Sequence, residues 1–254
     1  MLSVERHEKI LEQLDKSKII KVSELSKLLE VTEKTIRGDL ELLEQRGFLK
    51  RIHGGAVVAD GEGRMLPIAE RQSGYSDVKL AIAKEAVKLI KPNETILMDG
   101  GSTTSAIAEL LGDFPITVIT NDIKIAHVLL KKPMIQLMVL GGTRIDNSSS
   151  LMGAQATEML QRIRVNRLFF GTTGISLDHG LTVINSIHAD WKKQIISCAD
   201  QVTLLADSTK FEKVALINFA QIEEVDEIVT DSGISSDVLA ALEGKQVTLH
   251  IATV

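Results

Sequence analysis

The sequence predicts an α/β protein in two parts, an N-terminal winged helix-turn-helix and a larger α/β domain with a mainly parallel sheet. Residues 4–58 carry three short helical patterns, with a tight corner between the second and third, followed by a short basic strand pattern. From about residue 77, β-rich runs alternate with amphipathic runs, as in a parallel sheet with crossover helices. The length of 254 residues suits about two domains. We expect domains at 1–58 and 76–254, joined by a linker at 59–75.

The composition is that of an ordinary globular protein, with 44% hydrophobic and 25% charged residues. The single cysteine, Cys198, excludes an internal disulfide and fits a reducing compartment. The chain starts with charged residues rather than a signal peptide, and no apolar run approaches the roughly 18 residues of a membrane span. We therefore expect a cytoplasmic protein with no membrane contact, and we predict no metal and no cofactor.

Two helices are expected before the corner. The first, over residues 4–15, places Ile10, Leu11 and Leu14 on one face. The second is expected to start at Ser23, a good N-cap residue. It should bury three leucines, Leu25, Leu28 and Leu29.

The third helix has a core side and an outward side. Thr32 is expected to cap it, while Ile36, Leu40 and Leu43 fall on one face at 100° per residue and should be buried. The opposite side of the first two turns then carries a lysine, a threonine, an arginine and a glycine, which suits base edges and phosphates. Further along, Glu41 and Glu44 make the surface acidic, so DNA contact should be confined to the start of the helix.

A basic wing should follow the third helix. Gly47 is expected to end the helix, and residues 48–52 to form a strand that turns at 53–55 into a second strand at 56–58. Lys50, Arg51 and His53 are expected to touch phosphate, and His53 is a turn residue or, as the alternative, a specific base contact. The N-terminal 58 residues carry a net charge of only +1, from 11 Lys/Arg and 10 Asp/Glu, so a local basic patch is predicted rather than a basic domain. The candidate DNA contacts are Thr32, Lys34, Thr35, Arg37, Gly38, Lys50, Arg51 and His53.

The second domain should contain seven strands and several crossover helices. The β-rich runs are residues 95–98, 116–119, 136–140, 167–170, 202–205, 227–229 and 247–251. The amphipathic runs between them include residues 78–90, 104–111, 123–130 and 154–163. No clear element is visible at 173–187.

Polar and glycine residues follow the carboxyl end of nearly every predicted strand, where ligands bind in open α/β sheets. The turn at Gly100–Thr104 is the sharpest candidate for an anion, because glycines permit close approach and a helix N-terminus offers free amides. It lacks the lysine of a nucleotide-binding Walker A loop. A tight turn with no ligand is the alternative interpretation. The candidate ligand contacts are Asp99, Gly100, Gly101, Ser102, Thr103, Thr104, Thr120, Asn121, Gly142 and Lys210.

Both halves resemble the DeoR-type bacterial regulators of sugar catabolism. In the first half the resemblance rests on Leu25-Ser26, Val31-Thr32, the run from Thr35 to Leu40, Gly47, Arg51 and the run from His53 to Ala56. In the second half it rests on the run from Asp99 to Thr104, Thr120-Asn121, Gly141-Gly142, Gly153, Gly174 and the run from Asp207 to Phe211. The family usually has Arg or another polar residue where Gly38 stands, a glycine before the second helix where this chain has residues 17–20, and Glu where His188 stands.

The resemblance implies a transcriptional repressor of a sugar-catabolism operon, with a sensor domain similar in fold to ribose-5-phosphate isomerase. Its partners would be double-stranded operator DNA and a phosphorylated sugar effector, and one recognition helix touches so few base pairs that a homodimer or homotetramer is expected. The alternative is a sugar-phosphate isomerase carrying a DNA-binding domain, with Asp99, Asp178, Asp207 and Lys210 as acid/base groups. No carboxylate pair stands at a spacing that demands catalysis, so we predict that the protein is not an enzyme.

Overall fold

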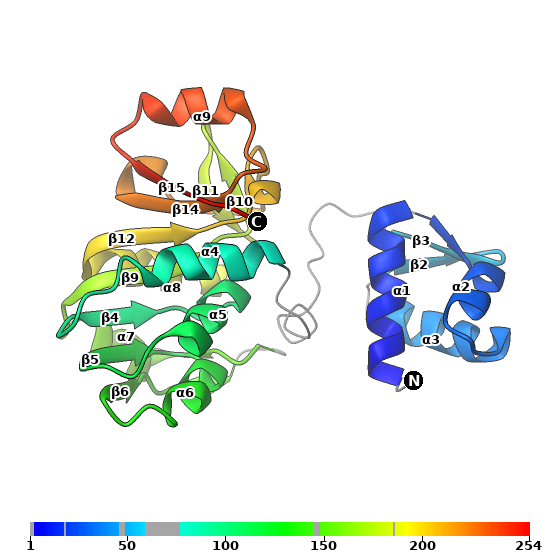
Figure 1. The fold of residues 1–254 in the computed structure, drawn as a ribbon, viewed down its shortest axis with the longest axis horizontal. Helices are drawn as coiled ribbons and strands as arrows, with labels where there is room; N and C mark the ends of the chain where they lie inside the picture. The colour runs from blue at the N-terminus through cyan, green and yellow to red at the C-terminus, as the bar shows by residue number, and fades with distance from the viewer. Residues whose placement is uncertain (1–2, 18, 46–48, 59–76, 145–147, 185) are drawn as a thin grey trace. The chain divides into compact units, whose positions relative to one another are not determined.

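The computed structural model describes residues 3–17, 19–45, 49–58, 77–144, 148–184 and 186–254 (Figure 1). The chain divides into two compact units, Met1–Leu66 and Pro67–Val254, and each is described on its own. The expected linker at 59–75 and the expected helix end at Gly47 lie outside the described residues, so the domain boundaries at 58 and 76 stay predictions.

The first unit is a small helical domain with a three-stranded antiparallel sheet in the order β1-β3-β2. Its apolar core joins all three helices to the sheet through buried side chains such as Ile10, Ile36 and Leu40. The elements are α1 (Ser3–Ser17), β1 (Ile19–Lys21), α2 (Val22–Leu28), α3 (Glu33–Gln45), β2 (Leu49–Ile52) and β3 (Gly55–Val58). The winged helix-turn-helix is confirmed.

Three details of this unit differ from the prediction. The segment between the first two helices, for which no strand was predicted, contains β1, which pairs with β3. Helix α2 begins at Val22, so Ser23 lies inside the helix and is not its N-cap. Val22 is buried, and its backbone nitrogen donates a hydrogen bond to the Gly54 carbonyl oxygen at 2.9 Å. The buried face of α2 therefore runs through Val22, Leu25 and Leu29. Leu28 points about 100° away from Leu29 and is 57% exposed.

A buried carboxylate joins α1 to α3. Asp39 accepts hydrogen bonds from Arg6 Nε at 2.6 Å, Arg6 Nη2 at 2.9 Å and His7 Nε2 at 2.9 Å. Burial alone would raise the pKa of the Asp39 carboxyl, but the hydrogen bonds and charges of Arg6 and His7 outweigh it and hold the pKa below its ordinary value. The orientation of α3 is thus fixed by a polar anchor as well as by the apolar core.

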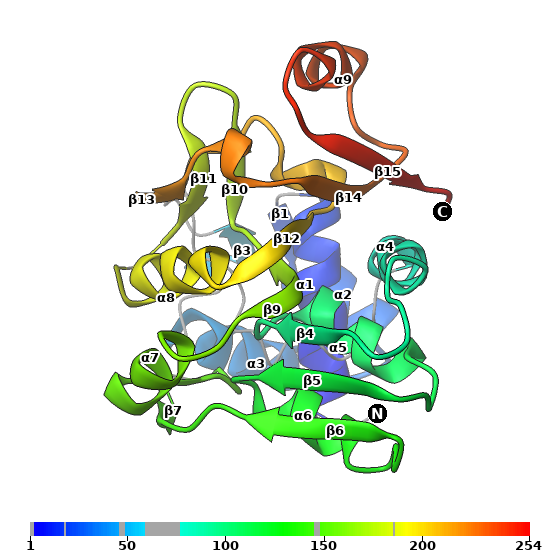
Figure 2. The same cartoon turned by 90° about the vertical axis from the view of Figure 1, so that its left-hand side faces the viewer.

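The second unit is built on a seven-stranded parallel sheet in the order β15-β14-β12-β9-β4-β5-β6, which Figure 2 shows from top to bottom. All seven predicted strands are present, which confirms the fold class. Their bounds are β4 (Thr95–Met98), β5 (Ile116–Thr120), β6 (Ile135–Val139), β9 (Val165–Gly171), β12 (Ala199–Leu205), β14 (Glu227–Asp231) and β15 (Thr248–Ala252).

The strand order reverses between β4 and β9. From β4 the chain proceeds outward to β5 and β6, and from β9 it proceeds the other way to β12, β14 and β15. Such a topological switch point opens a crevice at the carboxyl ends of the two strands. The fold therefore points to the residues that follow Met98 and Gly171 as the place for a ligand.

Two apolar layers cover the sheet, and neighbouring residues of each strand alternate between them. Met98 and Phe169 pack with helices α4 (Asp77–Val87), α5 (Ser102–Leu110) and α6 (Ile123–Leu129). Leu97 and Phe170 belong to the other layer, with helices α7 (Ala154–Leu160), α8 (Ser186–Ser197) and α9 (Ser236–Glu243). The helices on one face of the sheet come from residues 77–129, and those on the other face come from residues 154–243.

The segment 173–187, which showed no sequence pattern, contains two strands. Strands β10 (Gly174–Ser176) and β11 (Gly180–Val183) form a hairpin, and β13 (Ile217–Ala220) completes a three-stranded antiparallel sheet. Runs of three or four residues are too short to establish a period, which is why the sequence did not reveal them. A two-stranded ladder, β7 (Thr143–Arg144) with β8 (Leu151–Met152), and the short 3-10 turns η1 (Ser208–Lys210) and η2 (Ile222–Glu224) complete the elements.

None of the described helices is long and apolar enough to cross a membrane. Within the same residues, no group of three or more His, Cys, Asp or Glu side chains is placed to hold a metal ion.

Replacing Asp39 by Asn should lower the stability of the first unit by about 2 kcal/mol, because hydrogen bonds to a charged group are lost around a part-buried arginine. Chemical denaturation followed by circular dichroism measures this, while the fluorescence of Trp191, the chain's one tryptophan, reports the other unit. Glu41→Gln, an exposed carboxylate on the same helix, is the control. Equal midpoints for the two variants would contradict the anchor.

The contribution of Asp39 also sets a pH dependence. Because its folded-state pKa is lowered, the anchor stabilises the fold above the unfolded-state value of about 3.9, and this is lost as the pH falls through the folded-state pKa. The difference between the wild-type protein and Asp39→Asn should therefore shrink below about pH 4.

Candidate functional sites

The start of α3 presents the predicted outward face. Thr32, Lys34, Arg37 and Gly38 are exposed, while Ile36, Leu40 and Leu43 are buried on the opposite side. Thr32 caps the helix as predicted, since its Oγ1 accepts a hydrogen bond from the backbone N–H of Thr35 at 3.2 Å. The half-buried Thr35 hydroxyl lies 2.9 Å from the Thr32 hydroxyl, so this pair belongs to the cap.

Arg37 is oriented by its own helix. Its Nη2 lies 2.6 Å from Glu33 Oε2, one turn earlier, and 62% of its side-chain surface is exposed. Exposed pairs of this kind contribute only about 0.3–0.5 kcal/mol, so Arg37 can leave Glu33 for a base or a phosphate at little cost.

The wing exposes Lys50, Arg51 and His53, but Arg51 already has a partner. Glu44 of α3 accepts hydrogen bonds from Arg51 Nε at 2.7 Å and from the Arg51 backbone N–H at 2.8 Å. These hydrogen bonds raise the pKa of Arg51 and lower the pKa of Glu44. Glu44 was expected to repel DNA, but its charge is paired and it ties β2 to the end of α3.

Gly38 stands in open space. A Cβ atom built there meets nothing within 4 Å, so packing does not require a glycine. The position is exposed on the outward face of α3, and its lack of a side chain leaves the helix backbone accessible to a ligand.

The turn from β4 into α5 lies at the switch point. The N-cap residue of α5 is Gly101, which has no side chain, so no N-cap side chain accepts a hydrogen bond from the first backbone N–H groups of the helix. Ser102 and Thr103 are half-buried, and Thr104 Oγ1 donates to the Gly101 carbonyl oxygen at 2.9 Å. Free amides, hydroxyls and the positive end of the helix dipole favour an anion at this turn.

Gly100 is required by a close approach of another segment. A Cβ atom at this position would lie 2.0 Å from Ser150 Oγ and 2.8 Å from Asp122 Oδ2. Asp122 is fully buried, caps α6 through the N–H groups of Lys124 and Ile125, and accepts from Ser149 Oγ at 2.6 Å. The serine segment 148–150 therefore closes one side of the turn.

Thr120 and Asn121 support the turn from β5. Thr120 is fully buried and donates its hydroxyl to the Met98 carbonyl oxygen at 2.8 Å. Asn121 accepts from the Gly100 N–H at 3.3 Å and donates to the Leu151 carbonyl oxygen at 3.2 Å. Both side chains make internal bonds that hold the turn against its neighbours.

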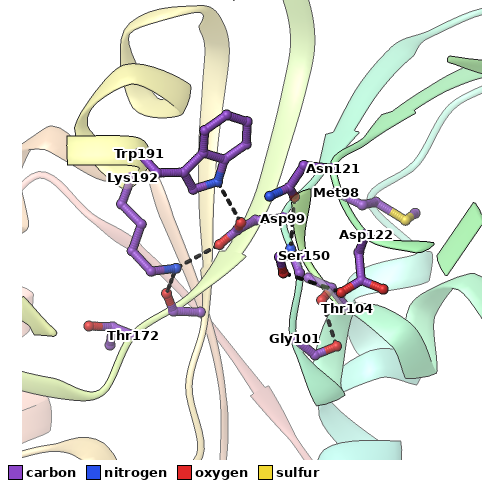
Figure 3. A network of polar contacts seen from close by, with 12 residues as sticks. Met98, Asp99, Gly101, Thr104, Asn121, Asp122, Ser150, Thr172, Trp191 and Lys192 are labelled. Carbon is purple, nitrogen blue, oxygen red and sulfur yellow. Dashed lines mark hydrogen bonds and ion pairs between the residues drawn. The ribbon is translucent and has the colours of Figure 1, made fainter. Parts of the chain in front are cut away.

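Asp99 connects the turn to α8 on the opposite layer (Figure 3). Its Oδ1 accepts from Trp191 Nε1 at 2.8 Å, and its Oδ2 lies 2.6 Å from Lys192 Nζ. Lys192 also donates to the Gly171 carbonyl oxygen at the end of β9, at 2.8 Å. Asp99 is 3% exposed, so this predicted effector contact lies inside a polar bridge across the switch point.

The remaining candidates lie farther along the sheet edge. Gly142 follows β6 and Lys210 follows β12, and each of these strands is separated from β4 by one other strand. Gly142 has a φ of 138° and its backbone packs against Met152, so it serves a turn. Asp207 caps the short turn η1 by accepting from the Thr209 N–H at 3.1 Å.

Five side chains of this network were not among the predicted contacts: Asp122, Ser149, Ser150, Trp191 and Lys192. Asp122 had a detectable signal, since an Asp directly before a helical pattern is a good N-cap. The others bind partners 27 to 93 residues away in the chain, and no spacing in the sequence reveals such contacts.

Comparison with known families accounts for both units. The model of the DeoR-like helix-turn-helix domain matches residues 6–62, and that of the DeoR C terminal sensor domain matches residues 75–232. The chain belongs to the DeoR family of transcriptional regulators. It is a DNA-binding regulator, and its sensor unit contains the switch-point turn.

Its relatives span the whole chain. The regulator YulB of Bacillus subtilis is 37% identical over 97% of this chain and 96% of its own length. GolR of Listeria innocua is 33% identical over 99% and 100%, and the putative aga operon repressor of Escherichia coli O157:H7 is 32% identical over 94% and 90%. These relatives are transcriptional regulators rather than enzymes.

Solved structures give a weaker likeness. Ribose 5-phosphate isomerase of Methanocaldococcus jannaschii superposes with a TM-score of 0.38 at 22% identity, over 53% of this chain and 54% of that one. At this TM-score and sequence identity, the similarity carries no argument about the activity of this chain.

Replacing Gly100 by Ala should destabilise the sensor unit by about 1–3 kcal/mol, because the new methyl group overlaps Ser150. Ser150→Ala removes the overlapping oxygen, so the double variant should recover part of the loss. Urea denaturation followed by Trp191 fluorescence measures both effects. Gly141→Ala, where a Cβ meets nothing within 4 Å, is the control. Additive effects of the two substitutions would contradict the contact.

Proposed function

We propose that the protein represses a sugar-catabolism operon and that a phosphorylated sugar controls its operator affinity. The observation that carries this proposal is the uncapped α5 N-terminus at the switch point of a DeoR sensor domain, a geometry suited to a phosphoryl group. The names of relatives support the sugar: one is an aga operon repressor and another, from Staphylococcus epidermidis, a lactose phosphotransferase system repressor.

On the DNA side, Lys34, Thr35 and Arg37 are proposed to meet base edges or phosphates in the major groove, while Lys50 and His53 contact the backbone. Thr32 and Gly38 complete the surface. Arg51 can join them through the guanidinium N–H groups other than the Nε that binds Glu44. One such helix reads a few base pairs, so the working unit is at least a homodimer with half-sites about 34–36 Å apart, or a multiple of that distance.

On the effector side, the phosphoryl group is proposed to bind the backbone amides and hydroxyls from Gly101 to Thr104. Both oxygens of Asp99 accept hydrogen bonds from α8, which favours a structural role for Asp99 over that of a catalytic base.

Arg37→Ala should weaken operator binding by about 5- to 150-fold while leaving the fold and effector binding unchanged, since one good base contact is worth about 1–3 kcal/mol. Arg164→Ala is a matched control, because Arg164 is also an exposed, ion-paired arginine but belongs to the sensor unit. Titration of labelled operator DNA against competitor DNA measures specificity. Unchanged specificity in Arg37→Ala would exclude α3 as the reader.

A thermal-shift panel tests the effector class. Ribose 5-phosphate, fructose 1-phosphate, tagatose 6-phosphate and glycerol 3-phosphate are compared with the same compounds lacking phosphate. A true effector at 100 times its Kd stabilises the sensor unit by about 2.7 kcal/mol. Thr103→Tyr should abolish that shift and the effector's influence on operator binding, without weakening operator binding itself. Equal shifts from phosphorylated and unphosphorylated compounds would overturn the proposed effector.

A further inference from the structure

Lys192 is a buried lysine at the switch point that no sequence pattern marked. Its side chain is 10% exposed, and its ammonium lies between the end of β4 and the end of β9. We propose that Lys192 supplies the positive charge that contacts the phosphoryl group of the effector, and that Asp99 holds Lys192 in place for it. This inference rests on the proposed function.

The charge around the turn requires a cation. The groups that the turn offers to an anion are neutral amides and hydroxyls, whereas Asp99 precedes the turn and Asp122 lies 2.8 Å from the Cβ position of Gly100. A phosphate monoester carries close to two negative charges at neutral pH. Bringing it beside two buried carboxylates is unfavourable unless a positive charge lies close to it.

Lys192 has the donor capacity for this contact. An ammonium has three N–H donors. Asp99 takes one and the Gly171 carbonyl takes another, and among the described residues no acceptor takes the third. A ligand oxygen can therefore bind without breaking either existing bond.

Its place in the sheet favours Lys192 over Lys210. Lys192 contacts β4 itself through Asp99, the residue directly before the Gly100 turn. Lys210 follows β12, and β9 lies between β12 and β4. At about 4.8 Å per strand, that places the backbone end of β12 roughly 10 Å from the end of β4.

Asp99 acts as a positioning residue. Trp191 Nε1 binds one of its oxygens, which leaves the other aimed at Lys192. Two rings, Phe170 and Phe219, lie with centroids 5.7 and 5.9 Å from Lys192 Nζ and restrict where the ammonium can move. Because Trp191, the chain's one tryptophan, binds Asp99 directly, its fluorescence reports on the site.

The test is a titration of the full-length protein with inorganic phosphate and with the four phosphorylated compounds above, followed by Trp191 fluorescence and by calorimetry. The variants are Lys192→Met, Asp99→Asn and the double variant, which removes both charges and leaves no unpaired carboxylate. Lys193→Met, which removes the same charge from an exposed neighbour on α8, is the matched control.

Lys192→Met and the double variant should bind the phosphorylated compounds at least tenfold more weakly, and Lys193→Met should bind like the wild-type protein. Asp99→Asn should weaken binding by less than Lys192→Met does, because the ammonium remains but loses the carboxylate that positions it. If Lys192 only neutralised the buried Asp99 carboxylate, the double variant would bind the phosphorylated compounds like the wild-type protein, and that result would overturn the assignment. A wild-type protein that binds no phosphorylated compound would overturn the effector proposal itself, and the role of Lys192 with it.

Discussion

The arrangement of the sensor unit around its switch point depends on the contacts of the buried Asp99 carboxylate with Trp191 and Lys192. It stands at the end of β4, where the strand order reverses, and receives Trp191 and Lys192 from the opposite layer. Burying a carboxylate is costly unless it is paired and hydrogen-bonded, and both oxygens are satisfied here. Losing Lys192 would leave the buried carboxylate unpaired, and losing Trp191 would remove one of its hydrogen bonds, so the turn into α5 and α8 are held together.

Carboxylates also position the recognition helix. Asp39 ties the middle of α3 to α1 through Arg6 and His7, and Glu44 ties its end to the wing through Arg51. Apolar side chains such as Ile36 and Leu40 pack α3 into the core, and these directional hydrogen bonds add fixed points at its middle and its end. The exposed start of α3 then presents Lys34 and Arg37 in a defined direction.

Structural features that depend on a local sequence pattern could be predicted from the sequence. Apolar runs such as 95–98 gave the sheet, and a helical period gave the buried face of α3. It misplaced the start of α2, where the Val22 N–H binds the carbonyl oxygen of Gly54 in the wing, and it misplaced Leu28, which points away from the buried face of Val22, Leu25 and Leu29. It could not find Lys192, whose contact with Asp99 spans 93 residues and exists only once two layers meet across a sheet.

The network also limits how an effector could act. A ligand shifts a conformational equilibrium only by its difference in affinity for the two states. Gly100 leaves no room between the turn and Ser150, so the turn cannot yield toward that side without displacing a buried segment. Helix α8 holds the other side through Lys192 and packs against β11 and β13. In the proposed complex, the neighbour of the phosphoryl group that can adjust is therefore the Lys192 ammonium of α8. A regulator needs a coupling free energy of about 1–3 kcal/mol between its two sites, and one hydrogen bond to a charged group contributes about that much.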